Sequence, residues 1–538
     1  MKPILFVIAI LVSVSSLAQQ NDALIYFTDK PNVADALANP ITILSQKSLD
    51  RKALHNILID ERDVPVNETY KAAIAARSGI TVLAKSKWLN AVYVRGSISA
   101  INSLANLSYV REIEFLDRSL NRRFQPKPLR DKFEVETEHR TNYNYGYAGN
   151  QVEMIQVNAL HEENYDGQGI TIAFMDNGYP NVLQNRAYLQ MRNQGRLLGY
   201  YDFVDRTENP RGTGSHGAAT LSTAAAFIDG EYVGTAPKAS YYLFITEDGR
   251  QESPVEEAWW VEALERADSL GVFVTNTSLG YLDFDVPAYN YQYADLDGHT
   301  TLGARGSNIA FEKGMLNVVS AGNEGSRFGY ITSPADALGS FTVGAVDSDG
   351  TRAWFSSHGP TYDGRIKPDV MAQGESAAII NEYGSVSFSN GTSFSGPIIA
   401  GAVASLWQAA PHLKNNVIMQ IIRESSSLYS SPTDEMGYGI PDFGDALARV
   451  EQLGIEVQMQ QQLFAIYPNP VESRFFVSFP NNKTVAQLAL YNILGQKLMQ
   501  QQISPTANSV DISSLNSGVY LVSITSENKT TSFKIIKK

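Results

Sequence analysis

Continuous apolar runs alternate with longer amphipathic stretches through the middle of the chain. The runs at residues 170–175 and 316–320 are uninterrupted and β-prone, as expected of strands that are buried on both faces of a parallel sheet. Two more runs lie at 241–245 and 272–275, and the stretch 254–270 between them has the length of a helix. This alternation predicts an α/β domain whose parallel sheet carries helices on both faces.

The predicted helix at 254–270 belongs to this α/β domain, which we place at residues 143–455. Charged side chains are seldom fully buried, so its glutamates are expected to form a solvated face: Glu256, Glu257, Glu262 and Glu265. Small residues dominate another helical stretch at 395–409, which would let that helix pass close to neighbouring backbones.

Two segments precede the α/β domain. Residues 4–14 form an apolar run that follows Lys2 and ends in small residues, which is typical of a secretory signal peptide (residues 1–18) cleaved after Ala18. The run is too short to span a membrane. Residues 19–125 follow the order β-α-β-β-α-β, which predicts a small α+β domain. Its strands are expected at 23–27, 80–84, 91–94 and 110–115, and its helices near 46–59 and at 98–107.

Two linkers and a C-terminal domain complete the predicted organisation. Residues 126–142 are charged, contain prolines and lack a strand pattern, so we expect a linker in which processing could occur. A second linker at 456–462 precedes residues 463–538, where short strands separated by turn residues predict a small all-β sandwich. The strands of this sandwich are expected at 474–479, 485–490 and 519–525.

Composition and charge narrow the functional classes. A chain of 538 residues is expected to hold more than one domain, and 43% hydrophobic with 18% charged residues is typical of globular proteins. The net charge of −13, without a sustained Lys/Arg cluster, argues against nucleic acid as a partner. The sequence has no cysteine, which excludes disulfides as well as thiol and Fe–S chemistry.

Three residues that could form a nucleophilic site stand in matching contexts. Asp176 closes a buried strand pattern, so its carboxylate is expected at the carboxyl end of the sheet. His216 opens a small-residue helical stretch, and Ser393 stands at the start of another, in Gly-Thr-Ser-Phe-Ser-Gly-Pro. A serine hydroxyl needs a base and a third group that orients this base. The order Asp…His…Ser is one of the known hydrolase layouts, so these residues predict a catalytic triad.

Asn323 adds a fourth candidate to this set. It follows the apolar run 316–320, and its side-chain amide could donate to the oxyanion of a tetrahedral intermediate, with the Ser393 backbone N–H as second donor. Each motif by itself is an ordinary turn or helix start. Their joint order from residue 176 to residue 393 makes catalysis the better interpretation.

The motifs together resemble those of the subtilisin-like serine peptidases, the subtilase family, over roughly residues 140–450. The motifs that carry the resemblance are Asp176–Gly178, His216–Gly217, Ser278–Gly280, Ala321–Gly325 and Gly391–Pro397. The resemblance implies that substrate is bound by residues along two walls: Ser278, Leu279, Gly280, Ala321 and Gly322. Asn177 and Ala218 depart from the family pattern, which usually has a hydroxyl residue at each position. The residues at the base of the pocket for the P1 side chain depend on folding.

The flanking domains have resemblances of their own. Residues 19–125 resemble a subtilase propeptide, which acts as a chaperone and temporary inhibitor; an unrelated ferredoxin-like binding domain is the alternative. The C-terminal domain contains Tyr467–Pro470, Asn492–Gln496 and a basic terminus, and resembles the C-terminal sorting domain of type IX secretion cargo. This implies export through the periplasm and outer membrane to the cell surface or medium. A carbohydrate- or substrate-binding sandwich is the alternative for this domain.

These features predict a secreted serine endopeptidase that is made as a zymogen and hydrolyses proteins through an acyl-enzyme. The expected partners are protein or peptide substrates, the chain's own propeptide and the type IX secretion machinery. We expect a monomer without a transmembrane segment. Three alternatives remain: a pseudo-peptidase with a blocked cleft, an esterase or peptide ligase on the same scaffold, and an adhesin that acts through its C-terminal domain.

The predicted chemistry requires no cofactor, but one metal hypothesis remains. Four aspartates lie in a loop-like insertion after Ser278–Gly280: Asp283, Asp285, Asp295 and Asp297. Carboxylate oxygens beside a turn-forming glycine would suit a structural Ca²⁺ ion. The full spacing of a calcium loop with its bidentate glutamate is missing, so solvated turn aspartates are the favoured interpretation.

Overall fold

The computed structural model describes residues 20–120, 143–461, 464–479, 484–493, 495–526 and 529–538. Two compact units make up the chain, Met1–Leu447 and Ala448–Lys538. The expected signal peptide at 1–18 and linker at 126–142 lie outside the described residues. Helix α13 (Phe443–Gln461) extends through most of the linker expected at 456–462.

A seven-stranded parallel sheet forms the centre of the first unit, in the order β13-β12-β11-β10-β5-β9-β6. The central strand β10 pairs Val274 with Ile172 of β5 on one side and with Leu316 of β11 on the other. The expected α/β fold is therefore confirmed. The strands are β5 (Thr171–Asp176), β6 (Leu197–Asp202), β9 (Ser240–Ile245), β10 (Val274–Thr277), β11 (Leu316–Ser320), β12 (Ser340–Val346) and β13 (Val370–Gln373).

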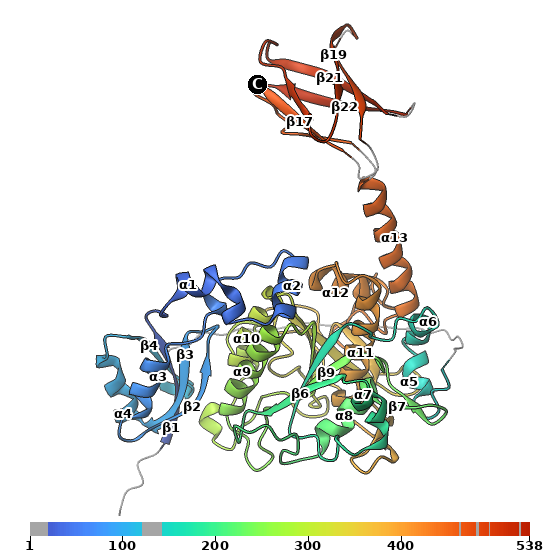
Figure 1. Ribbon diagram of the computed structural model, residues 1–538. Helices are drawn as coiled ribbons and strands as arrows, with labels where there is room; N and C mark the ends of the chain where they lie inside the picture. The colour runs from blue at the N-terminus through green and yellow to red at the C-terminus, as the bar shows by residue number, and fades with distance from the viewer. Residues whose placement is uncertain (1–19, 121–142, 462–463, 480–483, 494, 527–528) are drawn as a thin grey trace, which may run out of the picture. The chain divides into compact units, whose positions relative to one another are not determined.

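Helices cover both faces of this sheet (Figure 1). On one face Ala173 and Met175 of β5 pack in a cluster with Trp260 and Leu264 of α9. On the other face α8 and α11 pack against each other, and α11 contacts five of the strands: β5, β10, β11, β12 and β13. These helices are α8 (His216–Ala225), α9 (Val255–Leu270), α10 (Leu302–Glu312) and α11 (Thr392–Ala409).

Smaller elements complete the α/β domain. Its remaining helices are α5 (Gly149–Glu153), α6 (Val157–Glu162), α7 (Leu189–Asn193) and α12 (Asn415–Glu424). Two hairpins join β7 (Phe227–Ile228) to β8 (Tyr232–Val233), and β14 (Ala377–Ile380) to β15 (Val386–Ser389). None of the helices in the described parts of the chain is long and apolar enough to cross a membrane.

The expectation of a solvated glutamate face on α9 is wrong. Glu256, Glu257 and Glu265 are buried, with exposed fractions of 1%, 0% and 5%. Each carboxylate accepts hydrogen bonds from segments outside the helix; Glu265, for example, accepts from Ser86 Oγ at 2.6 Å. Burial raises the pKa of Glu265 to about 7. The face that looks solvated by composition is therefore a contact surface, because other parts of the chain cover it.

The N-terminal region folds as a four-stranded antiparallel sheet in the order β2-β3-β1-β4. Strand β1 lies in the middle of this order, and Ile25 pairs with Val92 of β3 and with Ile113 of β4. The expected small α+β domain is confirmed. Its elements are β1 (Gln20–Phe27), α1 (Val33–Ala38), α2 (Gln46–Leu54), α3 (Glu68–Ala75), β2 (Ile80–Ser86), β3 (Ala91–Ser97), α4 (Ile98–Ser103) and β4 (Val110–Phe115).

The first helix predicted for this domain packs differently from its other helices. The helix expected near 46–59 is α2, yet its buried side chains are polar: Ser48, Arg51 and Lys52. The helices whose residues join the apolar core of the sheet are α3, through Ile74, and α4, through Ile101. Helix α2 instead contacts α9 of the α/β domain. A helix without an apolar face has no reason to pack on the apolar core of the sheet.

The second unit ends in two antiparallel sheets, ordered β16-β17-β20 and β19-β18-β21-β22. Phe475, Val477, Leu488, Val522 and Ile535 form part of one buried core between them, as predicted for a sandwich. Leu494, in the turn after β18, lies outside the described residues. The strands are β16 (Ala465–Tyr467), β17 (Arg474–Ser478), β18 (Ala486–Asn492), β19 (Lys497–Ile503), β20 (Ser509–Asp511), β21 (Gly518–Ser526) and β22 (Lys529–Lys537).

Candidate active site

Asp176 and His216 meet at the carboxyl edge of the parallel sheet. Asp176 is the last residue of β5 and His216 the first residue of α8. The imidazole Nδ1 lies 2.8 Å from Asp176 Oδ1 and 3.0 Å from Oδ2. This contact places the ring proton on Nδ1 and leaves Nε2 as the basic nitrogen. The pair is therefore arranged as a base and the group that orients it.

The same contact tunes the acidity of His216. Burial by itself would lower the pKa of the imidazole, but the charge and hydrogen bond of Asp176 outweigh burial and raise this pKa above its usual value. The imidazole side chain nevertheless keeps 35% of its surface exposed, against 4% for Asp176. A substrate or a neighbouring hydroxyl can thus reach the histidine.

Glycines allow the two segments to approach each other this closely. A Cβ atom on Gly217 would lie 2.8 Å from Asp176 Cβ and 2.6 Å from the Gly178 carbonyl oxygen. A Cβ on Gly178 would meet the Arg211 and Gly214 carbonyl oxygens at 2.4 and 2.5 Å. The glycines of the Asp-x-Gly and His-Gly motifs are therefore required sterically, because a larger residue at either position would push the carboxylate and the imidazole apart.

Thr220 is a supporting residue that sequence reasoning missed. Its hydroxyl donates to Asp176 Oδ2 at 3.1 Å, while the backbone N–H of Asn177 donates to Oδ1 at 2.8 Å. Thr220 follows His216 by one helical turn, so both side chains lie on the same face of α8. This i, i+4 spacing is a signal in the sequence that would have identified it. Thr220 thus supplies, two residues later, the hydroxyl that the family usually has at the position of Ala218.

Ser393 lies at the start of α11, one residue inside the helix. Its Oγ donates to the Ser278 carbonyl oxygen at 3.2 Å, and Ser278 Oγ donates in return to the Ser393 carbonyl oxygen at 2.9 Å. The ring of the next residue, Phe394, lies 5.7 Å from the His216 ring. The structure therefore brings the predicted nucleophile, the predicted base and the segment Ser278–Gly280 to the same edge of the sheet.

Asn323 is held with its amide nitrogen toward the nucleophile. Its Oδ1 accepts from the Thr392 N–H at 2.9 Å and from the Thr392 hydroxyl at 3.1 Å, which orients the amide group. A Cβ atom built on Gly391 would lie 3.6 Å from both Asn323 Nδ2 and the Ser393 backbone nitrogen. Two N–H donors thus flank one small space, and Gly391, with φ of +149°, leaves this space open.

The predicted substrate-binding residues form two walls that meet at Thr332. Ser278 is buried while Gly280 is exposed, and on the facing wall Ala321 is buried beside Gly322. A Cβ on Gly280 would lie 2.2 Å from Thr332 Oγ1, and a Cβ on Gly322 would lie 3.1 Å from the same atom. Thr332 is 4% exposed, and its hydroxyl has no hydrogen-bond partner among the described residues. Sequence reasoning did not identify Thr332, because it lies outside the motifs and only folding returns it to the wall, where its N–H donates to the Ala321 carbonyl oxygen at 3.2 Å.

The four aspartates proposed for calcium are not brought together. No group of three or more His, Cys, Asp or Glu residues suited to a metal ion occurs in the described parts of the chain. Each aspartate accepts a nearby N–H instead: Asp283 from Asn290 Nδ2, Asp285 from Glu252 N, Asp295 from Gln292 N, and Asp297 from His299 N and Thr300 N. These aspartates therefore do not share a calcium site; Asp283, Asp295 and Asp297 bond within their own turns, and Asp285 bonds to the distant Glu252.

Comparison with known families agrees with this geometry and covers most of the chain. The profile of the subtilase family matches residues 167–439. A peptidase S8 propeptide domain of Bacteroidota matches residues 22–132, and a secretion system C-terminal sorting domain matches residues 465–538. The expected propeptide and sorting domain are thus confirmed, and the sorting domain indicates secretion through the outer membrane.

Individual relatives give the same result. Subtilisin E of Bacillus subtilis is 30% identical over 293 residues, which cover 54% of this chain and 68% of the relative. Serine protease AprX of Bacillus subtilis is 29% identical over 290 residues, or 48% of this chain and 62% of the relative. Subtilisin of Bacillus pumilus is 29% identical over 292 residues that cover 94% of its length. The chain belongs to the subtilase family of serine peptidases.

Proposed function

We propose that this protein is a secreted endopeptidase that cleaves proteins through an acyl-enzyme intermediate and is made as a zymogen. The observation that carries the proposal is the meeting of four side chains at one edge of the sheet: Asp176, His216, Ser393 and Asn323. Each comes from a different strand end or helix start, as expected for a site at the carboxyl edge of an α/β sheet. The family assignment supports the same chemistry.

The reaction begins at the Ser393 hydroxyl. This hydroxyl rotates from the Ser278 carbonyl toward His216 Nε2, which takes its proton as Oγ attacks the scissile carbonyl carbon. Asp176 holds the ring and stabilises the imidazolium. Asn323 Nδ2 and the Ser393 N–H donate to the oxyanion. The leaving amine then takes the proton from His216, and water repeats the sequence to release the acyl group.

The walls of the site indicate which P1 side chain the enzyme accepts. Thr332 lies between the glycines of both walls and narrows the space between them. We expect a shallow pocket that prefers small P1 residues, with alanine, serine and threonine above leucine and phenylalanine.

A positional peptide library tests this preference. Thr332→Gly should raise kcat/KM for P1 leucine by about 10-fold relative to P1 alanine, because the substitution deepens the pocket. A wild-type enzyme that prefers large aromatic P1 residues would contradict the assignment of the pocket.

The nucleophile is tested by Ser393→Ala. This variant should keep its propeptide attached, fail to cleave casein and fail to react with a fluorophosphonate probe. Ser431→Ala is the matched control, because Ser431 is an exposed serine far along the chain from the motifs. Self-processing and casein cleavage by Ser393→Ala would refute the assignment.

The probe also separates the alternatives. A pseudo-peptidase would not label even as the wild type, whereas an esterase or ligase would label and then act on esters or acceptor amines rather than proteins. Full activity of a chain that ends before residue 463 would argue against an adhesin.

A further inference from the structure

One segment of the propeptide does not pack on the propeptide's own sheet. Helix α2 begins after the N-cap Ser45, whose hydroxyl accepts from the Ser48 N–H at 3.2 Å. Arg51 and Lys52 in its last turn are only 2% and 1% exposed. Adjacent buried cations in a short helix require anionic partners, because an unpaired buried charge is strongly destabilising.

These partners come from both the propeptide and the α/β domain. Arg51 Nη2 lies 2.5 Å from Asp268 Oδ1, and Lys52 Nζ lies 2.9 Å from the same oxygen. Lys52 also reaches Asp63 at 3.3 Å, and Asp63 in turn pairs with Lys313 at 2.7 Å. We call these residues, together with Asp60 at 2.9 Å from Lys313, the anchor cluster. Its three cations balance its three carboxylates, and the pairs Arg51–Asp268, Lys52–Asp268 and Lys313–Asp63 join the propeptide to the α/β domain.

Neutral contacts extend the anchor cluster. The His55 ring stacks on Trp407 with centroids 5.7 Å apart and an interplanar angle of 2°, and meets Phe273 edge-on at 5.7 Å. His55 Nε2 also lies 2.8 Å from the Pro411 carbonyl oxygen. The Ser48 hydroxyl donates to the Asp268 carbonyl oxygen at 2.7 Å. The α/β domain therefore presents acidic, basic and aromatic groups that match successive residues of one propeptide segment.

This face is remote from the catalytic residues. Trp407 follows Ser393 by fourteen residues in the single helix α11, which places them about 21 Å apart along its axis. Phe273 immediately precedes β10, whereas Ser278 immediately follows it. The anchor cluster thus lies at the amino edge of the parallel sheet and the catalytic residues lie at the carboxyl edge.

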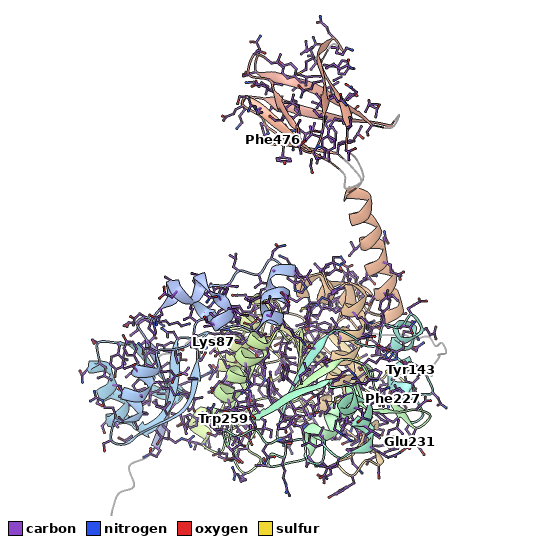
Figure 2. All side chains as sticks on the ribbon, viewed as in Figure 1. Lys87, Tyr143, Phe227, Glu231, Trp259 and Phe476 are labelled. Carbon is purple, nitrogen blue, oxygen red and sulfur yellow. The ribbon has the colours of Figure 1, made fainter. Side chains whose placement is uncertain are left out.

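The propeptide also contacts the α/β domain at a second place. Glu265 of α9 accepts from the Lys87 N–H at 2.9 Å and the Trp88 N–H at 3.0 Å, in the turn between β2 and β3. Trp259 Nε1 donates to the Leu83 carbonyl oxygen at 3.1 Å; Figure 2 labels Trp259 and Lys87. This contact uses the propeptide sheet, whereas the anchor cluster uses the segment 45–63.

We propose that the amino edge of the catalytic sheet is a separate docking site for the propeptide, formed by Asp268, Lys313, Phe273 and Trp407. Its ligand is a helix whose last turn carries adjacent Arg and Lys, followed by a histidine. This docking site holds the propeptide independently of the catalytic cleft, and it sets how long the propeptide stays bound after the chain is cut between residues 120 and 143.

The test separates docking from catalysis. The recognition sequence of an unrelated site-specific protease is introduced within residues 121–142 of a full-length Ser393→Ala chain. Cleavage then does not depend on the proposed activity. After the cut, the two fragments should elute together in gel filtration. Arg51→Ala with Lys52→Ala should release the propeptide about 100-fold faster, measured by dilution of a fluorescently labelled propeptide.

A matched control carries Lys71→Ala with Lys85→Ala. Both lysines are basic propeptide residues that pair with Glu68 in their own domain, so the release rate should stay within about threefold of the parent rate. An unchanged rate for the Arg51/Lys52 variant would overturn the proposal.

A second variant covers the case in which the double substitution fails to fold, which thermal unfolding of the uncut chain would show. His55→Ala removes the stacked ring without leaving an unpaired charge. It should release the propeptide about 10-fold faster. Parent-like release from this variant would equally overturn the docking site.

Discussion

The two edges of the catalytic sheet use charged side chains in opposite ways. At the carboxyl edge Asp176 and His216 form one hydrogen-bonded pair, and the imidazole keeps 35% of its surface exposed. At the amino edge the anchor cluster interlocks six charged groups, and five of them are at most 2% exposed: Arg51, Lys52, Asp63, Asp268 and Lys313. A group that must exchange a proton keeps one nitrogen uncommitted and accessible, whereas a charge that only holds two segments together can be buried when it is paired. In this molecule the exposed imidazole belongs to the pair proposed for catalysis, and the buried charges belong to the cluster that attaches the propeptide.

The largest expected effect is at the carboxyl edge. Asp176→Asn removes the charge that stabilises the imidazolium and permits the wrong tautomer of His216, so kcat should fall by about 10⁴-fold. The measurement is kcat on a peptide amide with processed enzyme. A loss below tenfold would show that Asp176 does not orient the base, and the contrast between the two edges of the sheet would no longer hold.

A large effect on stability is expected at the amino edge. Lys313 is 1% exposed and pairs with Asp60 and Asp63, so Lys313→Ala removes a buried cation and leaves the buried Asp63 carboxylate with the longer contact to Lys52, at 3.3 Å. The free energy of unfolding of the full-length Ser393→Ala chain should fall by about 3–5 kcal/mol, measured by denaturant titration.

The control for Lys313 is a pair whose cation is partly exposed. Arg206 pairs with Glu262 at 2.8 Å while 36% of its side chain is exposed, so Arg206→Ala should change stability by less than about 1 kcal/mol. Equal losses for the two variants would mean that burial of the anchor cluster does not matter.

Asn323→Ala sharpens the assignment of the oxyanion donors. Because the Asn323 amide is aimed at the space beside the Ser393 N–H, its removal should lower kcat by about 10²- to 10³-fold. KM should change little, because the donor acts on the transition state. A rise in KM at unchanged kcat would assign Asn323 to substrate binding instead.

The smallest expected effect is a shift in the pH profile. His216 must be neutral to accept the Ser393 proton, so activity rises with pH through the pKa of this imidazole. Asp176 raises that pKa above its usual value, so the acid limb of kcat/KM should have its midpoint above about pH 6.5. A midpoint below this value would mean that burial outweighs the carboxylate.

Much of the catalytic edge was predictable because its signals are local. A strand that ends in Asp176 and helices that start at His216 and Ser393 are read from neighbouring residues, and parallel strands bring such ends together. Gly178 and Gly217 belong to the same local signals, since each permits a close approach. Thr220 carried a local signal as well, through its i, i+4 spacing from His216.

The rest depended on partners that are distant in the chain. Glu265 looked solvated on α9, yet it is covered by Ser86, Lys87 and Trp88, nearly 180 positions away. The residues of helix α2 predicted a helix, but they did not show that it contacts Asp268 of the α/β domain. Thr332 completes a pocket whose walls come from two other strands.

The amino-acid sequence by itself determined the fold class of each region and the candidate residues at the strand ends, because periodicity and turn residues act over a few positions. Only the tertiary structure decided what covers each polar face, and therefore which charges are buried and paired. Periodicity shows that a face exists; the partner that packs on it comes from another part of the chain.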